Sequence, residues 1–286
     1  QIAIDQLRTA DQQPFFLWVH YFDPHFTFVR HPQFGFADGY SGRFGDKISN
    51  ADVRKALGDG GVSESDIAYV KNVYDEEIAF TSQWIGVLLN EIKRKKDRKQ
   101  ITILTADHGE YFMERGRFFH GEDVYRELVH VPLIIAGDID PTLRGTTKEE
   151  TVSLISIPKT IMSQVGIGAG AHHFNGIDLL IKTDKTQTHT VFSEGSHLWG
   201  RGNQNKAIIN SKWKLIHTPA TGAFELYDRN TDPSELHNRY NATISPSVKA
   251  LQQQLMAFPA STAAKPGTVD TSPETIEQLK ALGYVE

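Results

Sequence analysis

The chain has 286 residues, of which 39% are hydrophobic and 23% are charged, so it can bury the core of one large globular domain or two modest ones. Its formal net charge of -5 is small for this length and gives no overall field that would attract nucleic acid or an anionic membrane. Cysteine is absent, which excludes disulfides, thiolate metal sites and a cysteine nucleophile in this sequence, and no apolar run reaches the ~20 residues of a membrane-spanning helix.

The first part of the chain predicts a short helix, a strand and a long loop. A short amphipathic helix is expected over residues 4–10. A secretory leader would show a basic segment followed by an apolar one, and these residues do not have that pattern. A fragment or a mature form is therefore expected. The apolar run at residues 15–19 is typical of a strand that is buried on both faces. A loop rich in proline, glycine and aromatic residues is expected from residue 23 to about residue 60.

A long helix is expected after this loop. Ser63 and Asp66 form a capping pair, and apolar residues recur at helical spacing as far as Ile92. The basic cluster at residues 93–99 fits the last turn of this helix, where cations oppose the negative end of the helix dipole. A nucleic-acid patch is the alternative interpretation of the cluster, and we prefer the helix end.

Strands and helices alternate in the middle of the chain. Strands are expected at residues 101–105, 131–136 and 191–193, and a helix over residues 156–166. This alternation predicts an α/β layer with a largely parallel sheet flanked by helices.

The last third of the chain has a different pattern, in which short strands joined by turn-rich segments predict an antiparallel meander. We therefore expect an α/β domain over residues 1–190 and a smaller antiparallel β subdomain, with a helix and a tail, over residues 191–286. The strands of this subdomain are expected at residues 206–210, 213–217 and 224–227, and its helices at residues 247–258 and 273–282.

Two polar motifs follow predicted buried strands, where open α/β sheets build their sites. They are Asp23-Pro24-His25 and Asp107-His108-Gly109, and both should project from one rim of the sheet. An adjacent aspartate and histidine offer one hard oxygen and one imidazole nitrogen to a single cation, and Gly109 lets the backbone come close. Taken alone, Asp107 and His108 more often serve a turn or a helix cap, and His25 and His120 more often are packed, hydrogen-bonded side chains.

Longer strings occur in an order that is informative as a whole. They are Phe-Phe-Leu-Trp-Val-His-Tyr-Phe-Asp-Pro-His at residues 15–25, Tyr-Asp-Glu-Glu-Ile at 74–78, Leu-Thr-Ala-Asp-His-Gly-Glu at 104–110, His-Gly at 120–121, Glu-Leu-Tyr-Asp at 225–228 and Leu-Lys-Ala-Leu-Gly-Tyr at 279–284. In this order, and over nearly the full chain, they resemble the sulfatase family of the alkaline-phosphatase superfamily.

The resemblance implies an alkaline-phosphatase-like fold and metal-dependent hydrolysis of sulfate esters. Asp107 and His108 would be two ligands of a divalent cation, which is calcium by the family's habit, with manganese or another metal as the alternative. His25 would contact the sulfate or protonate the leaving oxygen, and His120 would neutralise the sulfate. A cation and imidazolium groups suit this reaction, because sulfuryl transfer builds negative charge on the equatorial and leaving oxygens. A periplasmic or extracellular location is likewise the family's habit.

The sequence departs from the family where the nucleophile belongs. No Cys or Ser opens the family's Cys/Ser-x-Pro-x-Arg formylglycine motif, and the paired N-terminal aspartates that complete the family's metal site have no match. One carboxylate and one imidazole fall short of the roughly 6–8 oxygen ligands that calcium prefers. The N-terminal half of the domain is therefore an expected partner, and the isolated chain is expected to be inactive.

Two other functions compete with this interpretation. One is a phosphodiester or phosphonate hydrolase of the same superfamily, since an Asp-His half-site serves phosphoryl as well as sulfuryl transfer. The other is a non-catalytic remnant that at most binds anions or a partner chain. The nucleophile, Cys or Ser as against Thr, would distinguish the two enzymes.

Overall fold

The computed structural model describes residues 2–9, 14–95, 98–121, 123–167, 174–181, 189–195, 204–241, 245–258 and 273. These residues group into two compact units. The first unit comprises the described residues within Gln1–Lys99, Phe112–Phe118 and Ala263–Glu286, and the second those within Gln100–Tyr111 and Phe119–Thr262. The domain boundary expected at residue 190 stays a prediction.

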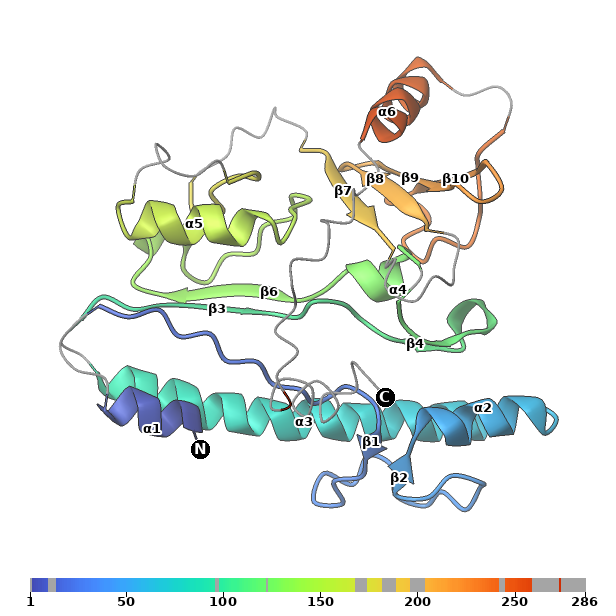
Figure 1. The fold of residues 1–286 in the computed structure, drawn as a ribbon, viewed down its shortest axis with the longest axis horizontal. Helices are drawn as coiled ribbons and strands as arrows, with labels where there is room; N and C mark the ends of the chain where they lie inside the picture. Colours follow the sequence, from blue (N-terminus) through green and yellow to red (C-terminus); the bar gives the residue numbers. More distant parts are fainter. Residues whose placement is uncertain are drawn as a thin grey trace. The chain divides into compact units, whose positions relative to one another are not determined.

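Helices dominate the first unit (Figure 1). Its elements are α1 (Ile2–Thr9), β1 (Phe28–Val29), β2 (Lys47–Ile48), α2 (Asn50–Gly58) and α3 (Glu64–Arg94). The predicted start of the long helix is confirmed, because Ser63 and Asp66 form both hydrogen bonds of a capping box. Helix α1 packs on α3 through Ile4, Leu7 and Leu88. Helix α2 lies inside the expected loop and begins with a second capping box, formed by Ser49 and Asp52.

The expected strand at residues 15–19 is extended but belongs to no hydrogen-bonded sheet in the described part of the chain. One face of this segment packs as expected, since Leu17 and Val19 contact the cluster between α1 and α3. Its other face is open, with Phe16 74% and Trp18 79% exposed. A strand needs a neighbour to satisfy its ladder, and the described residues supply none here.

This open face yields a prediction about the isolated chain. Exposed aromatic side chains on an unpaired strand form a hydrophobic patch, so the chain should raise the fluorescence of a hydrophobic dye. The double substitution of Phe16 and Trp18 by serine should lower that fluorescence. Substitution of Ile2, which is 80% exposed on α1, by serine is the matched control and should change it little. A wild-type chain that gives no dye signal would contradict the prediction.

The second unit contains most of the strands. They are β3 (Ile101–Thr105), β6 (Leu133–Gly137), β7 (Val191–Glu194), β8 (Lys206–Ile209), β9 (Trp213–Thr218) and β10 (Ala223–Asp228). The two-residue strands β4 (Tyr111–Phe112) and β5 (Phe118–Phe119) each have one residue in each unit. Its helices are α4 (Arg126–Val129), α5 (Ser156–Gln164) and α6 (Pro246–Ala257), with a short 3-10 helix at Pro141–Leu143. A second 3-10 helix, Glu114–Gly116, belongs to the first unit.

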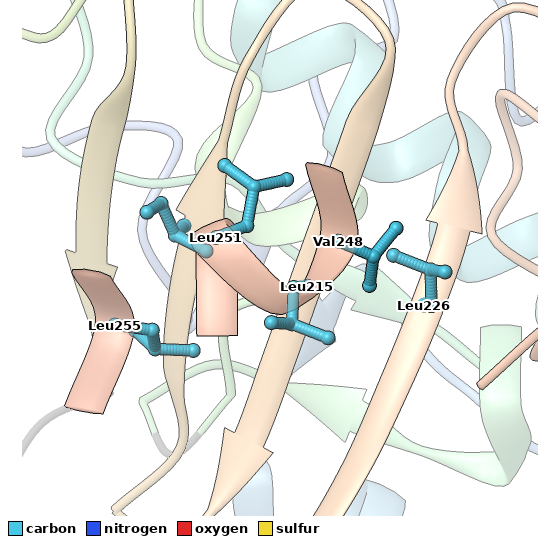
Figure 2. Packing of buried hydrophobic residues seen from close by; sticks show 6 residues of the cluster. Leu215, Leu226, Val248, Leu251 and Leu255 are labelled. Atoms are coloured by element: carbon cyan, nitrogen blue, oxygen red, sulfur yellow. The ribbon is translucent and has the colours of Figure 1, made fainter. Parts of the chain in front are cut away.

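The expected antiparallel meander is confirmed. Strands β7 to β10 form one sheet in the order β10-β9-β8-β7, and every neighbouring pair is antiparallel. Helix α6 covers one face of this sheet with Val248, Leu251 and Leu255, which recur at helical spacing. Figure 2 shows these three side chains meeting Leu215 of β9 and Leu226 of β10. The expected last helix at residues 273–282 lies outside the described residues, apart from residue 273.

The pairing of β3 with β6 departs from the parallel arrangement expected to dominate the sheet. These two strands are antiparallel, with Thr105 opposite Leu133 and Ile101 opposite Gly137. A parallel pair needs a crossover that returns the chain to the other end of the first strand. The described residues of the connection from residue 106 to 132 form short strands, a 3-10 turn and the one-turn helix α4, and the register places the start of β6 opposite the end of β3. The α/β class itself is confirmed.

In the described part of the chain, no helix combines the length and the apolar character that crossing a membrane requires.

Candidate active site

The loop after β3 is held close to helix α4 by Gly109. The Gly109 amide donates to the carbonyl oxygen of Leu128 at 2.8 Å. A Cβ atom at this position would lie 2.1 Å from the carbonyl oxygen of Glu127, so a larger residue would push the loop away from α4. Gly109 therefore allows a close approach of the loop to α4, while its expected role at a cation site stays a prediction.

Asp107 and His108 form a partly exposed pair at the carboxyl end of β3. The Asp107 side chain is 76% exposed and the His108 side chain 37%, and Oδ2 of Asp107 lies 3.6 Å from Nε2 of His108. The other carboxylate oxygen, Oδ1, accepts a hydrogen bond from the His108 amide at 3.0 Å. This local bond restrains the aspartate side chain and leaves Oδ2 as the oxygen near Nε2 of His108.

His120 lies against this pair and is bonded to Glu110. The rings of His108 and His120 have centroids 4.0 Å apart, and Nδ1 of His120 lies 3.0 Å from Oε2 of Glu110. Glu110 is 5% exposed, and its other oxygen, Oε1, has no hydrogen-bond partner among the described residues. The backbone around His120 is unusual, since Phe119 has φ 75° and Gly121 φ 125°. A bulky residue at positive φ costs about 1–3 kcal/mol. Other contacts of the fold must offset this cost at Phe119.

His25 belongs to the first unit, whereas Asp107, His108 and His120 belong to the second. Its Nδ1 lies 2.7 Å from the carbonyl oxygen of Phe26, and its ring contacts those of Phe22 and Phe26 at centroid distances of 4.6 and 4.3 Å. The expectation that His25 and Asp107 share one sheet rim stays a prediction. The catalytic and metal-binding roles of all four residues also stay predictions.

The three histidines share one hydrogen-bond pattern. In each of them Nδ1 faces an acceptor: the carbonyl of Phe26 for His25, the carbonyl of Gly109 for His108, and the carboxylate of Glu110 for His120. A carbonyl or carboxylate oxygen only accepts, so each of these contacts is a hydrogen bond in the tautomer that carries a proton on Nδ1. Histidines that bind metals commonly donate their second nitrogen to a carbonyl or carboxylate in this way.

The donor set of Asp107 and His108 fits a divalent cation as half of a site. Ligand bonds of about 2.0–2.6 Å allow two donors 3.6 Å apart to contact one ion. The described residues contain no group of three or more His, Asp or Glu side chains arranged to hold a metal ion. Further ligands would have to come from residues outside this pair, as the resemblance to the sulfatase family implies.

Sequence reasoning did not assign a role to Glu110. Its position directly after the Asp-His-Gly motif was visible, but its contact with His120 spans ten positions that include two short strands and a 3-10 helix. No periodicity connects two residues across such a loop, so only the structure identifies the pair.

Solved structures share this fold. A protein of Bacteroides thetaiotaomicron that is assigned to the sulfatases aligns with a TM-score of 0.65 and 18% identity, over 90% of this chain and 61% of its own. The phosphonate monoester hydrolase of Agrobacterium radiobacter aligns with a TM-score of 0.56 and 19% identity, over 79% of this chain and 46% of its own. At these identities the likeness shows the fold alone. The chain therefore has the alkaline-phosphatase-like α/β fold.

The family follows from the sequence. The family model named Sulfatase matches residues 2–167, and the model of the C-terminal region of N-sulphoglucosamine sulphohydrolase matches residues 113–260. The first match covers more than half of the chain, so the chain belongs to the sulfatase family. Arylsulfatase K of Mus musculus is 29% identical over 193 residues, which are 63% of this chain and 34% of that relative. The chain thus spans about a third of the length of this curated relative.

Proposed function

We propose that this chain is the part of a sulfatase that supplies a metal half-site and anion-contacting histidines for the hydrolysis of sulfate esters. The observation that carries the proposal is the cluster at the end of β3, where Asp107, His108, Glu110 and His120 lie together. It supplies oxygen and nitrogen donors beside an imidazole whose Nδ1 proton is bonded to a buried carboxylate. Family membership gives this cluster a chemistry that its geometry alone does not specify.

In this proposal Asp107 Oδ2 and His108 Nε2 hold the divalent cation, calcium or manganese. When bound, such a cation supplies charge stabilisation for the oxygens of the sulfate. In its protonated form His120, oriented by Glu110, offers Nε2 as a donor to a sulfate oxygen. His25 contacts the sulfate or protonates the leaving oxygen, and the contact of its Nδ1 with the carbonyl oxygen of Phe26 leaves Nε2 for either task.

We further propose that the isolated chain does not turn over sulfate esters. Sulfatases of the resembled type form a covalent intermediate on a formylglycine, and the sequence contains no residue in that motif. Removal of a nucleophile removes most of the barrier reduction that a covalent mechanism provides. The remaining donors would bind metal weakly and anions transiently. A non-catalytic remnant, the competing interpretation of the sequence, would bind anions in the same way.

A second candidate is hydrolysis of a phosphonate or a phosphodiester, favoured by the fold likeness to phosphonate monoester hydrolase. The same half-site would stabilise the charge on phosphoryl oxygens. Parallel assays of aryl sulfate and aryl phosphonate by the complete protein distinguish the two. Sulfate turnover that exceeds phosphonate turnover supports the first candidate, and the reverse order supports the second.

The half-site predicts weak metal binding that depends on Asp107. Calorimetric titration of the isolated chain should give a dissociation constant on the order of millimolar, with manganese bound more tightly than calcium because one of the two donors is an imidazole nitrogen. Asp107→Ala should abolish the signal. Asp59→Ala, at an exposed aspartate after α2, is the control and should leave it unchanged. Metal binding that survives Asp107→Ala would show that other residues hold the ion.

A further inference from the structure

Helix α3 buries four polar side chains that all contact the long loop carrying His25. They are Asp66, Glu76, Glu77 and Thr81, each 8% exposed or less. A buried carboxylate or hydroxyl is costly unless it is hydrogen-bonded, so the partners of these groups show what the helix holds in place. Asp66 accepts from the hydroxyl of Tyr40. The other three contact the part of the loop between residues 23 and 37.

Glu76 organises the middle of this loop. Its carboxylate accepts hydrogen bonds from the amides of His31 at 2.7 Å and Ala37 at 3.0 Å, and from the guanidinium of Arg30 at 3.3 Å. Burial acts to raise the pKa of Glu76, but these donors hold it below its ordinary value. Glu76 is therefore a charged anchor for residues 30–37, beyond the segment that contains His25.

Glu77 and Thr81 contact the two ends of the segment that contains His25. The amide of Val29 donates to Oε1 of Glu77 at 2.7 Å, and the hydroxyl of Thr81 donates to the carbonyl oxygen of Asp23 at 3.3 Å. The two helix residues are four positions apart, so they lie on one face of α3 about one turn from each other. Loop residues 24–28, which include His25, therefore lie between two hydrogen bonds to α3, one at Asp23 and one at Val29.

We propose that Glu77 and Thr81 are positioning residues that clamp both ends of the His25 segment onto α3 and so fix the place of the His25 imidazole. The imidazole follows its own backbone, because Nδ1 donates to the carbonyl of Phe26 and the ring packs on Phe22 and Phe26. The inference rests on the proposed function, in which His25 contacts the sulfate. Glu77 also faces Nε2 of His31 at 3.2 Å, which ties the next part of the loop to the same carboxylate.

Hydrogen exchange of the 286-residue chain, followed by mass spectrometry, tests the clamp without any need for activity. Thr81→Val removes the hydroxyl with little change of shape, and Glu77→Ala removes the acceptor for Val29. Each should speed exchange in peptides covering residues 24–31 by roughly 5–30-fold, the factor for a loss of about 1–2 kcal/mol. Glu77→Gln keeps an acceptor oxygen and should retain most of the protection. Asp75→Ala, on the exposed side of α3, is the matched control.

Three outcomes decide the inference. Exchange at the wild-type rate in Thr81→Val and Glu77→Ala would overturn it. Equal loss in Glu77→Gln and Glu77→Ala would also overturn it, because the charge facing His31 and not the acceptor for Val29 would then hold the segment. If Glu77→Ala fails to fold, Thr81→Val alone still decides, since it alters the other end of the clamp.

Titration with inorganic sulfate separates this inference from the proposed function. In the wild-type chain, the ring resonances of His25 should shift with sulfate, and the shift should weaken in Thr81→Val while the resonances of the β7–β10 sheet stay unchanged. A wild-type His25 that does not respond would overturn its proposed contact with sulfate, whereas the exchange rates would still decide the clamp.

Discussion

Replacing Lys214 by alanine should destabilise the second unit by about 3–5 kcal/mol, the cost of breaking a buried ion pair on one side. Lys214 is 1% exposed, and its Nζ lies 2.9 Å from both carboxylate oxygens of Glu235, which is itself 4% exposed. The substitution removes this ammonium group while Glu235 remains in a desolvated position. Chemical denaturation followed by circular dichroism measures the change in the free energy of unfolding.

The neighbouring Lys212 provides the matched control. It is exposed, and its ammonium group lies over the ring of Trp213 at 4.9 Å from the centroid. Lys212→Ala should change the free energy of unfolding by no more than about 0.5 kcal/mol, as surface substitutions usually do. Equal effects of the two substitutions would mean that the buried pair contributes no more than a surface charge.

Local signals in the sequence predicted much of the fold because they act over a few residues. The reciprocal bonds of Ser63 and Asp66 were predicted from identity and spacing alone, and the structure contains both. The same signal at Ser49 and Asp52 was overlooked within a loop rich in proline and glycine, although it begins α2. A capping box is therefore informative even where the surrounding composition favours a loop.

The pairing of strands could not be predicted in the same way, because it depends on residues far away in the chain. The apolar run at residues 15–19 encodes burial on two faces, yet Phe16 and Trp18 stay exposed for want of a neighbour in the described residues. The orientation of β3 and β6 depends on how the connection between them folds, and hydrophobic periodicity does not encode that path. Burial patterns identify a strand but do not identify its partner.

The same distinction between local and long-range contacts applies to the candidate site. Asp107 and His108 are adjacent in sequence, so their proximity was certain and only their chemistry had to be inferred. The contact of His120 with His108 and with Glu110 depends on Phe119 at positive φ and on the close approach at Gly109. Residue type alone predicts neither the positive φ of Phe119 nor the packing of Gly109 against α4, although the sequence does mark Gly109 as a place where the backbone can come close.

The largest change in activity is expected when the chain is combined with the N-terminal part of a sulfatase that carries a matured formylglycine. The isolated chain should hydrolyse an aryl sulfate no faster than background, because none of its residues matches the motif that would accept the sulfuryl group. The combination, covalent or in trans, should first restore metal affinity, since the added aspartates complete the half-site of Asp107 and His108. Turnover should follow only where the nucleophile is matured.

Substitutions in the combined protein then assign the roles. Asp107→Ala should return turnover to background, because it removes a proposed metal ligand, and should weaken metal binding in the same preparation. His25→Ala should lower turnover by about 10²–10⁴-fold, the usual contribution of a proton-transferring or charge-stabilising group, while metal affinity is retained. His237→Ala, at an imidazole with a 79% exposed side chain, is the control and should change neither quantity. A structural defect would lower metal affinity and turnover together in every variant. A loss of turnover with retained metal affinity in His25→Ala therefore distinguishes a role in the reaction from such a defect. Turnover by the purified chain alone that Asp107→Ala abolishes would overturn the proposal, since it would require a nucleophile within these 286 residues.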